Sequence, residues 1–240
     1  MSSRLRFLVF AWILIGAAAS MKQEGGFLWR PVLAQVAGER TVRSVVADAI
    51  ARGKGLTEAE QEEALRVALI GLKEEERLEA WLVDEEGASR QIRSYPFTAN
   101  SGVLGPKLKE GDLQIPEGIY KVEYLNPQSS YHLSIKLDYP NAFDRARAEE
   151  EGRTHLGGDI FIHGRAVTIG CIPIGDEAIE DLFAIVDQIG TSKVQVIIAP
   201  RDFRKGLEEP EIERVEWEAS LYQEIREALQ PFEPGDREEE

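Results

Sequence analysis

Hydrophobic residues recur with the period of β-strands through the long central part of this chain. The runs LEAWLVD and RQIRSYPF flank the turn-forming EEGAS, which is the pattern of a β-hairpin. Four later stretches alternate or form short apolar runs between clusters of Gly and Pro: GIYKVEYL, SSYHLSIKLDYP, GGDIFIHG and KVQVIIAP. We therefore predict an α+β domain that is mainly β over residues 77–204.

One amphipathic helix interrupts the predicted strands. Apolar residues fall on one face from Asp176 to Ile189, Asp176 is suited to cap the start, and GTS ends the helix. Between Asn141 and Gly152 the chain is highly charged, which fits either a surface loop or one or two helical turns. Of these two we favour the loop.

Helices are also predicted on both sides of the β-rich region. Apolar spacing predicts one helix around Val42–Ala49 and, after the break RGKG, a second that includes Ala64–Leu72. Residues 20–76 are therefore expected to form a helical N-terminal region. Residues 205–240 are expected to hold a final helix from Glu211 to Leu229, followed by a disordered acidic tail.

The N-terminus has the pattern of an export signal. Arg4 and Arg6 precede an apolar run that ends in small residues suited to cleavage, so residues 1–19 are predicted to be a signal peptide. The apolar run is shorter than the roughly 20 residues that span a bilayer, so cleavage is favoured over a permanent membrane tether. We expect a protein of the periplasm or cell envelope.

The composition excludes several partners. The formal net charge is −15, whereas a nucleic-acid surface needs clustered Lys and Arg, so no nucleic-acid partner is predicted. The sequence has neither a glycine-rich nucleotide loop nor His and Cys at metal-ligand spacing. No cofactor and no metal are therefore predicted.

The only cysteine, Cys171, lies eight positions after His163, one of the three histidines. A lone thiol is either a buried inert residue or one kept for its reactivity. A thiol attacks a carbonyl as the thiolate, and imidazole is the usual base that removes its proton. If His163 ends a strand and the chain then doubles back, eight residues suffice to bring the two side chains together. The sequence thus predicts a Cys171 and His163 catalytic pair.

Two glycines flank this pair. Gly170 leaves the backbone open, so that its N–H and that of Cys171 are predicted to form an oxyanion hole. Gly164 is predicted to let a main-chain carbonyl approach the imidazole and hold its tautomer. The sequence shows no obvious side chain as a third member of the catalytic group.

The stretch IFIHG, followed by Thr168, Gly170 and Cys171, resembles the active-site signature of the YkuD-type L,D-transpeptidases. The stretch SYPFTANSGVLGPKLKEGDLQIPEGIY is similar to the segment by which that family enters its catalytic domain. The short spacing between the histidine and the cysteine, Pro173 and YPNAFDRA resemble the branch of murein amidases that release a wall-linked lipoprotein.

The resemblance implies a sandwich-like mixed sheet with a packed helix and the flanking helices as additions. It implies acyl transfer through a Cys171 thioester on peptidoglycan stem peptides, at the carbonyl on the L-centre of a diamino acid such as diaminopimelate. Transpeptidation and hydrolysis both remain open, and a wall-linked lipoprotein is a further candidate partner. The alternative is a non-catalytic peptidoglycan-binding protein that keeps the fold.

Four residues are weaker candidates for contact with the substrate. Thr168 either orients the nucleophile or simply forms the turn, and the resemblance favours the active-site role. Arg165 is placed to pair with a carboxylate of the stem peptide or to be merely solvated, and Lys107 has the same two interpretations. His155 is either a surface residue or a substrate contact. His132 is interpreted as structural.

Overall fold

The computed structural model describes residues 40–210 and 215–233, and the described residues from Thr41 onward belong to one compact unit. Three predictions lie wholly or partly outside the described residues: the signal peptide over 1–19, the start of the last helix at 211, and most of the acidic tail. No helix in the described ranges has the length and apolarity needed to cross a membrane.

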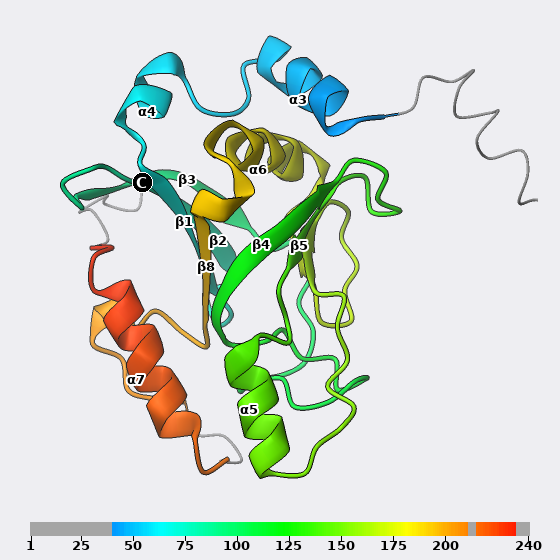
Figure 1. Cartoon of the computed structure of the whole chain (residues 1–240), viewed down its shortest axis with the longest axis vertical. Coiled ribbons are helices and arrows are strands. Elements are labelled where there is room, and N and C mark those ends of the chain that lie inside the picture. Colours follow the sequence, from blue (N-terminus) through cyan, green and yellow to red (C-terminus); the bar gives the residue numbers. More distant parts are fainter. Residues whose placement is uncertain (1–39, 211–214, 234–240) are drawn as a thin grey trace, which may run out of the picture. The chain divides into compact units, whose positions relative to one another are not determined.

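The described chain is built on one mixed sheet, most of whose strands are labelled in Figure 1. Its strand order is β3-β2-β1-β8-β4-β5-β6-β7. Neighbouring strands are antiparallel except for the pairs β1 with β8 and β6 with β7, which are parallel. The fold is therefore α+β and mainly β, as predicted. The strands are β1 (Arg66–Leu72), β2 (Arg77–Val83), β3 (Ser89–Pro96), β4 (Gly118–Asn126), β5 (Ser134–Leu137), β6 (Phe161–His163), β7 (Ile172–Pro173) and β8 (Val194–Ala199).

The helices are placed before, within and after this sheet. They are α3 (Val42–Ala51), α4 (Glu58–Glu63), α5 (Ala142–Glu150), α6 (Asp176–Ile189) and α7 (Glu218–Leu229), with short 3-10 helices at η2 (Thr191–Lys193) and η3 (Phe203–Lys205). Helix α7 begins later than predicted, since residues 216 and 217, directly before it, form a turn. Helix α6 has the predicted bounds, but its N-cap is Gly175 and Asp176 makes no cap.

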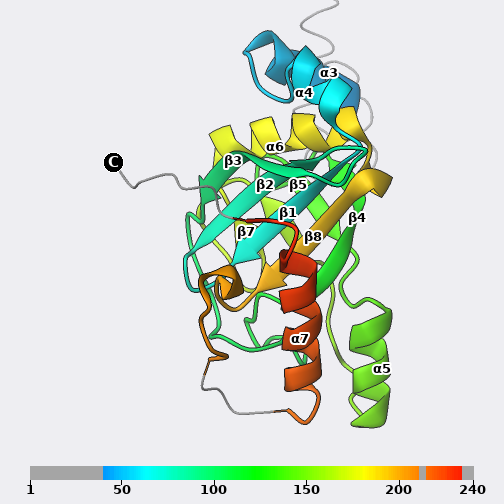
Figure 2. The same ribbon diagram turned by 90° about the vertical axis from the view of Figure 1, so that its left-hand side faces the viewer.

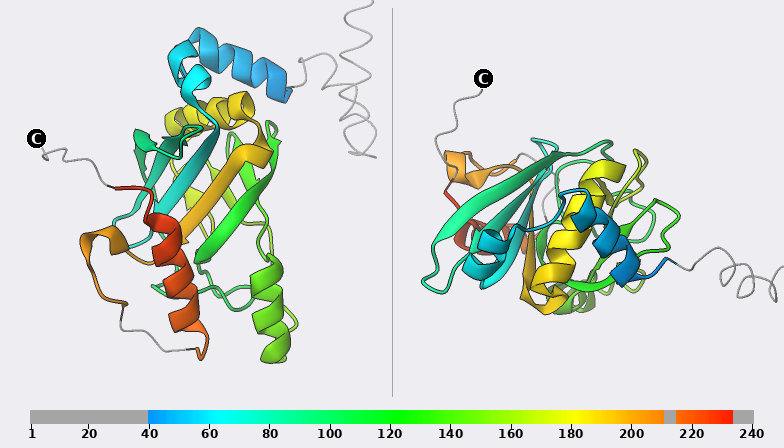
Figure 3. Two further views of the ribbon diagram at one scale, coloured as in Figure 1. Left: turned by 60° about the vertical axis from the view of Figure 1, so that its left-hand side comes forward. Right: turned by 90° about the horizontal axis from the view of Figure 1, so that it is seen from above.

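Two hydrophobic cores lie on the two faces of the sheet. Helix α6 covers one face with residues that include Leu182, Phe183 and Val186, all fully buried. Helix α7 covers the other face with residues that include Tyr222 and Ile225 (Figures 2 and 3). Helix α3 lies across the outer side of α6, so the N-terminal helix is held to the domain through α6.

Strand β1 replaces the second N-terminal helix that the spacing predicted, so that prediction is wrong. The capping box of Thr57 and Glu60 starts only the short helix α4, which ends at Glu63. In β1, Val67 and Leu69 enter the core under α6, while Ala68, Ile70 and Leu72 enter the core under α7. A strand buried on both faces has no alternation, so its apolar residues also satisfied a helical spacing.

Residues 142–150 form helix α5, so the favoured prediction of a loop is wrong and the helical alternative is correct. Asn141 caps the helix by accepting the N–H of Asp144 at 3.1 Å, and the Asp144 carboxylate accepts the N–H of Asn141 at 2.9 Å. This reciprocal cap supplies two of the hydrogen bonds that a helix start otherwise lacks. It explains why so polar a segment is helical.

The carboxyl group of Asp144 makes stability depend on pH. Burial raises its pKa to about 6, against the lowering effect of its bond from the Asn141 N–H. A folded-state pKa above the unfolded value means that the native state holds the extra proton, so stability falls as pH rises through this interval. We expect a loss of about 2 kcal/mol between pH 4 and 7 from this group.

The Asp144→Asn variant should lose most of this dependence while it keeps an acceptor for the Asn141 N–H. Urea unfolding of both proteins at pH 4, 5.5 and 7 measures the difference. Equal slopes of unfolding free energy against pH in the two proteins would contradict the assignment.

A buried lysine holds the long loop between β3 and β4. Lys73 follows β1, and its Nζ donates to the carbonyl oxygens of Val103, Gly105 and Ile115, each at 3.0 Å, and to Glu117 Oε1 at 2.8 Å. Both side chains of the ion pair are at most 2% exposed. The loop that borders the candidate site is therefore fixed to the end of the central strand β1.

Candidate active site

The sheet brings the predicted pair together on two neighbouring strands. His163 ends β6, and Cys171 immediately precedes β7, which runs parallel to β6 with Ile162 paired to Ile172 and His163 to Pro173. Continuing this register places Cys171 opposite Phe161. Side chains two residues apart on a strand share a face, so Cys171 is on the same face as His163 and lies diagonal to it.

The imidazole of His163 is buried and fixed in one orientation. Its Nδ1 lies 2.5 Å from the Gly164 carbonyl oxygen, and its ring packs on that of Tyr131 with centroids 4.6 Å apart. Since a carbonyl only accepts, Nδ1 carries the proton and Nε2 is the basic nitrogen. Burial lowers the pKa of His163, although the Gly164 carbonyl opposes this. The resting imidazole is therefore neutral at pH 7.

Gly164 occupies a position where a side chain does not fit. A Cβ there would lie 2.6 Å from Asp176 Oδ1 and 2.8 Å from the carbonyl oxygen of Tyr131. The glycine thus permits close approach of the start of α6, whose Asp176 accepts the N–H of Arg165 at 2.8 Å. The predicted carbonyl near the imidazole is that of Gly164 itself.

Cys171 is partly buried and rests against main-chain atoms. Its Sγ lies 3.5 Å from the carbonyl oxygen of Asp159, and no hydrogen bond joins it to His163 within residues 40–210 and 215–233. Burial raises the pKa of the thiol, and the N–H of Phe161 and the charge of Lys136 act in the opposite direction. Catalytic hydrogen bonds often tighten only when substrate binds, and this resting arrangement is compatible with that.

Thr168 closes the loop that carries the cysteine. Its Oγ1 donates to the Cys171 carbonyl oxygen at 2.7 Å and accepts the Gly170 N–H at 3.1 Å. Gly170 has φ +132, and a Cβ there would lie 3.0 Å from the Gln114 carbonyl oxygen. The Gly170 N–H is engaged within the loop, so the structure does not offer it to an oxyanion, and the Cys171 N–H is the remaining donor of the predicted two.

Lys136 belongs to the same face, and the sequence analysis missed it. In β5 it pairs with Phe161, which places it across Phe161 from Cys171. Its Nζ lies 5.3 Å from the centroid of the Phe161 ring, and the residue is only 7% exposed. The sequence feature that could have revealed Lys136 is a charged residue within the strand SIKL, on the face opposite Ile135 and Leu137.

The sequence profile of the L,D-transpeptidase catalytic domain, YkuD, matches residues 72–198, more than half of the chain and both members of the pair. The chain belongs to the YkuD family. The domain is also 37% identical over 134 residues to two Escherichia coli proteins, from strains K12 and O157:H7, each called "Putative L,D-transpeptidase YafK". This match covers 53% of the chain and 51% of each relative, so the chain spans about half the length of these curated relatives.

Two solved structures to which this chain is similar are bacterial proteins. The helical cell shape determining protein Pgp2 from Campylobacter jejuni is 21% identical, with a TM-score of 0.47. The match covers 68% of this chain and 56% of the Pgp2 chain. The Bdellovibrio bacteriovorus protein Bd1075 is 21% identical, with a TM-score of 0.42. The match covers 75% of this chain and 58% of the Bd1075 chain.

Two other predicted site residues, Lys107 and Arg165, differ in burial and in their partners. The Lys107 ammonium is buried and bonded internally, to Asp112 Oδ1 at 2.5 Å and to the Lys109 carbonyl oxygen at 3.0 Å. It is therefore part of the loop structure and is not presented to a ligand. Arg165 is exposed, and its Nε lies 3.9 Å from Asp176 Oδ2.

His155 lines a pocket of about 500 Å³ in the YkuD domain. The pocket borders the cysteine loop through Gln114, whose carbonyl oxygen packs against Gly170. Lys109, Arg153 and Asp112 also line it, so its wall carries charges of both signs. The structure thus places His155 in the wall of a pocket that borders the cysteine loop.

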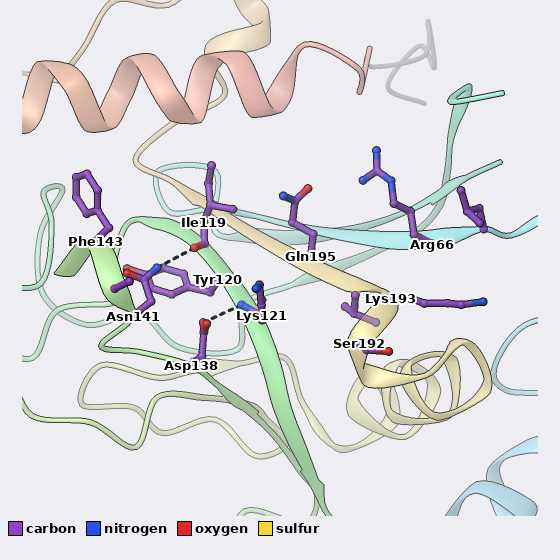
Figure 4. Close-up of a pocket in the computed structure, with 13 residues that line it drawn as sticks. Arg66, Ile119, Tyr120, Lys121, Asp138, Asn141, Phe143, Ser192, Lys193 and Gln195 are labelled. Carbon is purple, nitrogen blue, oxygen red and sulfur yellow. Dashed lines mark hydrogen bonds between the residues drawn. The ribbon is translucent and has the colours of Figure 1, made fainter. Parts of the chain in front are cut away.

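A second pocket of about 600 Å³ lies elsewhere on the YkuD domain, over β1, β8 and β4 beside α5 (Figure 4). Two hydrogen bonds shape it, from Asn141 Nδ2 to the Ile119 carbonyl oxygen at 2.9 Å and from the Lys121 N–H to Asp138 Oδ1 at 2.8 Å. Strands β5 and β6 separate it from β7, and none of its residues is a predicted site residue. This pocket is therefore separate from the predicted pair of Cys171 and His163.

Proposed function

We propose that this protein is a cysteine acyltransferase or amidase that acts on peptidoglycan stem peptides through a thioester on Cys171. One observation carries the proposal: the Gly164 carbonyl fixes the Nδ1 proton of His163, so Nε2 is left as a base on the strand beside Cys171. Membership of the YkuD family supports the reaction class.

The first half of the reaction forms the acyl-enzyme. Nε2 of His163 takes the thiol proton, and Sγ of Cys171 attacks the carbonyl carbon on the L-centre of the diamino acid. The Cys171 N–H stabilises the negative charge that develops on the carbonyl oxygen. The imidazolium then gives its proton to the leaving amine as the carbon–nitrogen bond breaks, and the thioester remains.

The second half restores the enzyme. His163 removes a proton from an incoming amine or from water, and this nucleophile attacks the thioester carbonyl. The carbon–sulfur bond breaks, and His163 returns the proton to the thiolate. An amine acceptor gives a new peptide link, whereas water gives cleavage. The short connection from His163 to Cys171, the feature shared with the amidase-type branch, favours cleavage of a wall-linked lipoprotein as one such reaction.

The proposed substrate sets the location of the protein. Peptidoglycan lies outside the cytoplasmic membrane, and residues 1–19 have the signal pattern that directs a chain there. We therefore propose a periplasmic or envelope protein, released from the membrane if the signal is cleaved and tethered to it if the signal is kept.

The test is to incubate the purified protein, and its Cys171→Ala variant, with muropeptides that carry diaminopimelate and with lipoprotein-linked muropeptides. Intact-protein mass spectrometry detects the adduct, and the mass of the released products identifies the acceptor. We expect an adduct on wild type and none on Cys171→Ala. Exchanged or cross-linked products indicate transpeptidation, and cleaved products alone indicate hydrolysis. Binding of muropeptides with neither adduct nor product would replace the proposal with a non-catalytic binding role.

A further inference from the structure

Lys136 and Cys171 share two neighbouring residues, Phe161 and Asp159. Phe161 separates them in the sheet, and its main-chain N–H points to Sγ of Cys171 while its ring lies under Nζ of Lys136. Asp159 is the second shared neighbour, since its carbonyl oxygen is 3.5 Å from Sγ and its carboxylate Oδ1 is 3.9 Å from Nζ. The ammonium and the thiol therefore occupy the same small area of the sheet face.

The ammonium of Lys136 is buried, and its two ion-pair partners lie at the long end of the distance range for such pairs. An ammonium has three N–H donors, and within the described ranges Nζ makes one hydrogen bond, to the Leu137 carbonyl oxygen at 3.1 Å. The two carboxylates nearest to it, Glu123 and Asp159, stay at 4.0 and 3.9 Å, beyond hydrogen-bond distance, and both are largely exposed. A buried charge held in this way is costly unless a further anion forms nearby.

The proposed reaction creates such an anion. Cys171 must become a thiolate, and burial of both partners disfavours a thiolate with an imidazolium, since it raises the pKa of Cys171 and lowers that of His163. Proton transfer from Cys171 to His163 thus needs a third charge that stabilises the product side. Opposite charges in a poorly hydrated site interact much more strongly than in water.

We propose that Lys136 is a positioning residue whose ammonium is the counter-charge of the Cys171 thiolate. This inference rests on the nucleophilic role proposed for Cys171. The charged groups that act on the thiol are Lys136 and Lys107, which favour the thiolate, and Asp159, which opposes it. Of the two lysines, Lys107 is the one already paired at close range, with Asp112, so Lys136 is the cation with donors to spare.

The decisive measurement is the pH dependence of Cys171 alkylation by iodoacetamide, in the absence of any peptidoglycan substrate. Cys171 is the only cysteine, so the reaction reports on this thiol alone. In Lys136→Met the midpoint should rise by about one pH unit or more, which reduces reactivity about tenfold at pH values below the midpoint. Lys136→Arg keeps the charge and should stay near wild type, and Lys205→Met serves as the distant control.

Turnover of muropeptides gives the second measurement. In Lys136→Met, kcat should fall by about the same factor as thiol reactivity while KM stays near the wild-type value. A rise in KM with an unchanged alkylation midpoint would mean that Lys136 binds substrate, and it would overturn the inference. Equal midpoints in Lys136→Met, Lys136→Gln and wild type would also overturn it, provided that thermal unfolding shows all three folded.

The two proposals fail in different ways. If muropeptides are untouched but the midpoint shifts as expected, the function is wrong and the pairing of Lys136 with the thiolate stands. If muropeptides are turned over but the midpoint does not move, the function stands and the role of Lys136 is wrong.

Discussion

Replacement of His163 with asparagine should slow acylation of Cys171 by about 10²- to 10⁴-fold, the usual contribution of a general base. Asparagine is the informative change because its side-chain amide can still donate to the Gly164 carbonyl in place of Nδ1. The variant therefore keeps the hydrogen bond that orients the residue and lacks the basic nitrogen. A stopped-flow or quenched measurement of thioester formation with a muropeptide donor gives the rate.

The pH profile should separate a base from a packing residue. Because burial lowers the pKa of His163, the neutral base persists to lower pH than an ordinary histidine does. The acidic limb of the pH profile, where the wild-type rate declines, should therefore lie below a pH of about 6.5. That limb should disappear in His163→Asn, and added imidazole should restore part of the rate. His132→Asn is the matched control, since His132 pairs with Glu180 on α6. A His163→Asn rate within twofold of wild type would contradict the assignment.

Replacement of Lys73 with methionine should destabilise the protein by about 3 to 5 kcal/mol, as expected when one partner of a buried ion pair is removed. Glu117 would be left buried and charged, and among the described residues its remaining donors would be the Gly105 N–H at 2.7 Å and the Tyr222 hydroxyl at 2.8 Å. Three loop carbonyls would also lose their shared donor. Thermal unfolding should show Tm lower by on the order of 10 °C.

A double variant tests the mechanism of this loss. Lys73→Met combined with Glu117→Gln removes the stranded charge and should recover part of the stability, although the loop carbonyls stay without their donor. Lys205→Met on the surface is the control and should leave Tm unchanged. A Lys73→Met protein with the wild-type Tm would show that the loop does not depend on this ion pair.

The sequence predicted the fold where patterns were unambiguous. The hairpin of β2 and β3 is marked by the turn EEGAS, strand β8 by its β-branched residues and helix α6 by a single apolar face, and all three were confirmed. The prediction for β1 failed because a capping box at Thr57 and Glu60 precedes the strand, and its apolar residues, buried on both faces, also fit a helical spacing. The prediction for α5 was wrong because the helix starts with a reciprocal cap between Asn141 and Asp144. The high charge of the segment alone does not indicate such a cap.

The placement of His163 and Cys171 next to each other was predictable from the sequence, whereas the contacts around them were not. The sequence distance between His163 and Cys171 indicated the pair, but the relation of Lys136 to the thiol depends on strands β5 and β6 lying side by side. Periodicity does not reveal which strands become neighbours. Likewise, nothing local showed that Asp112 takes up the Lys107 ammonium or that Thr168 takes up the Gly170 N–H.

The parallel pairing of β1 with β8 has a consequence for how the chain reaches this fold. Val67 pairs with Val194, so the centre of the sheet joins segments that most of the described chain separates. Until β8 has been synthesised, β1 and β4 both lack a neighbour and expose hydrogen-bonding edges that other chains can join. Such non-local closure is slow compared with local hairpin formation. A growing chain therefore stays vulnerable to proteases and to aggregation until residue 199 has left the ribosome. The residues of β5, β6 and β7 have been synthesised before that point.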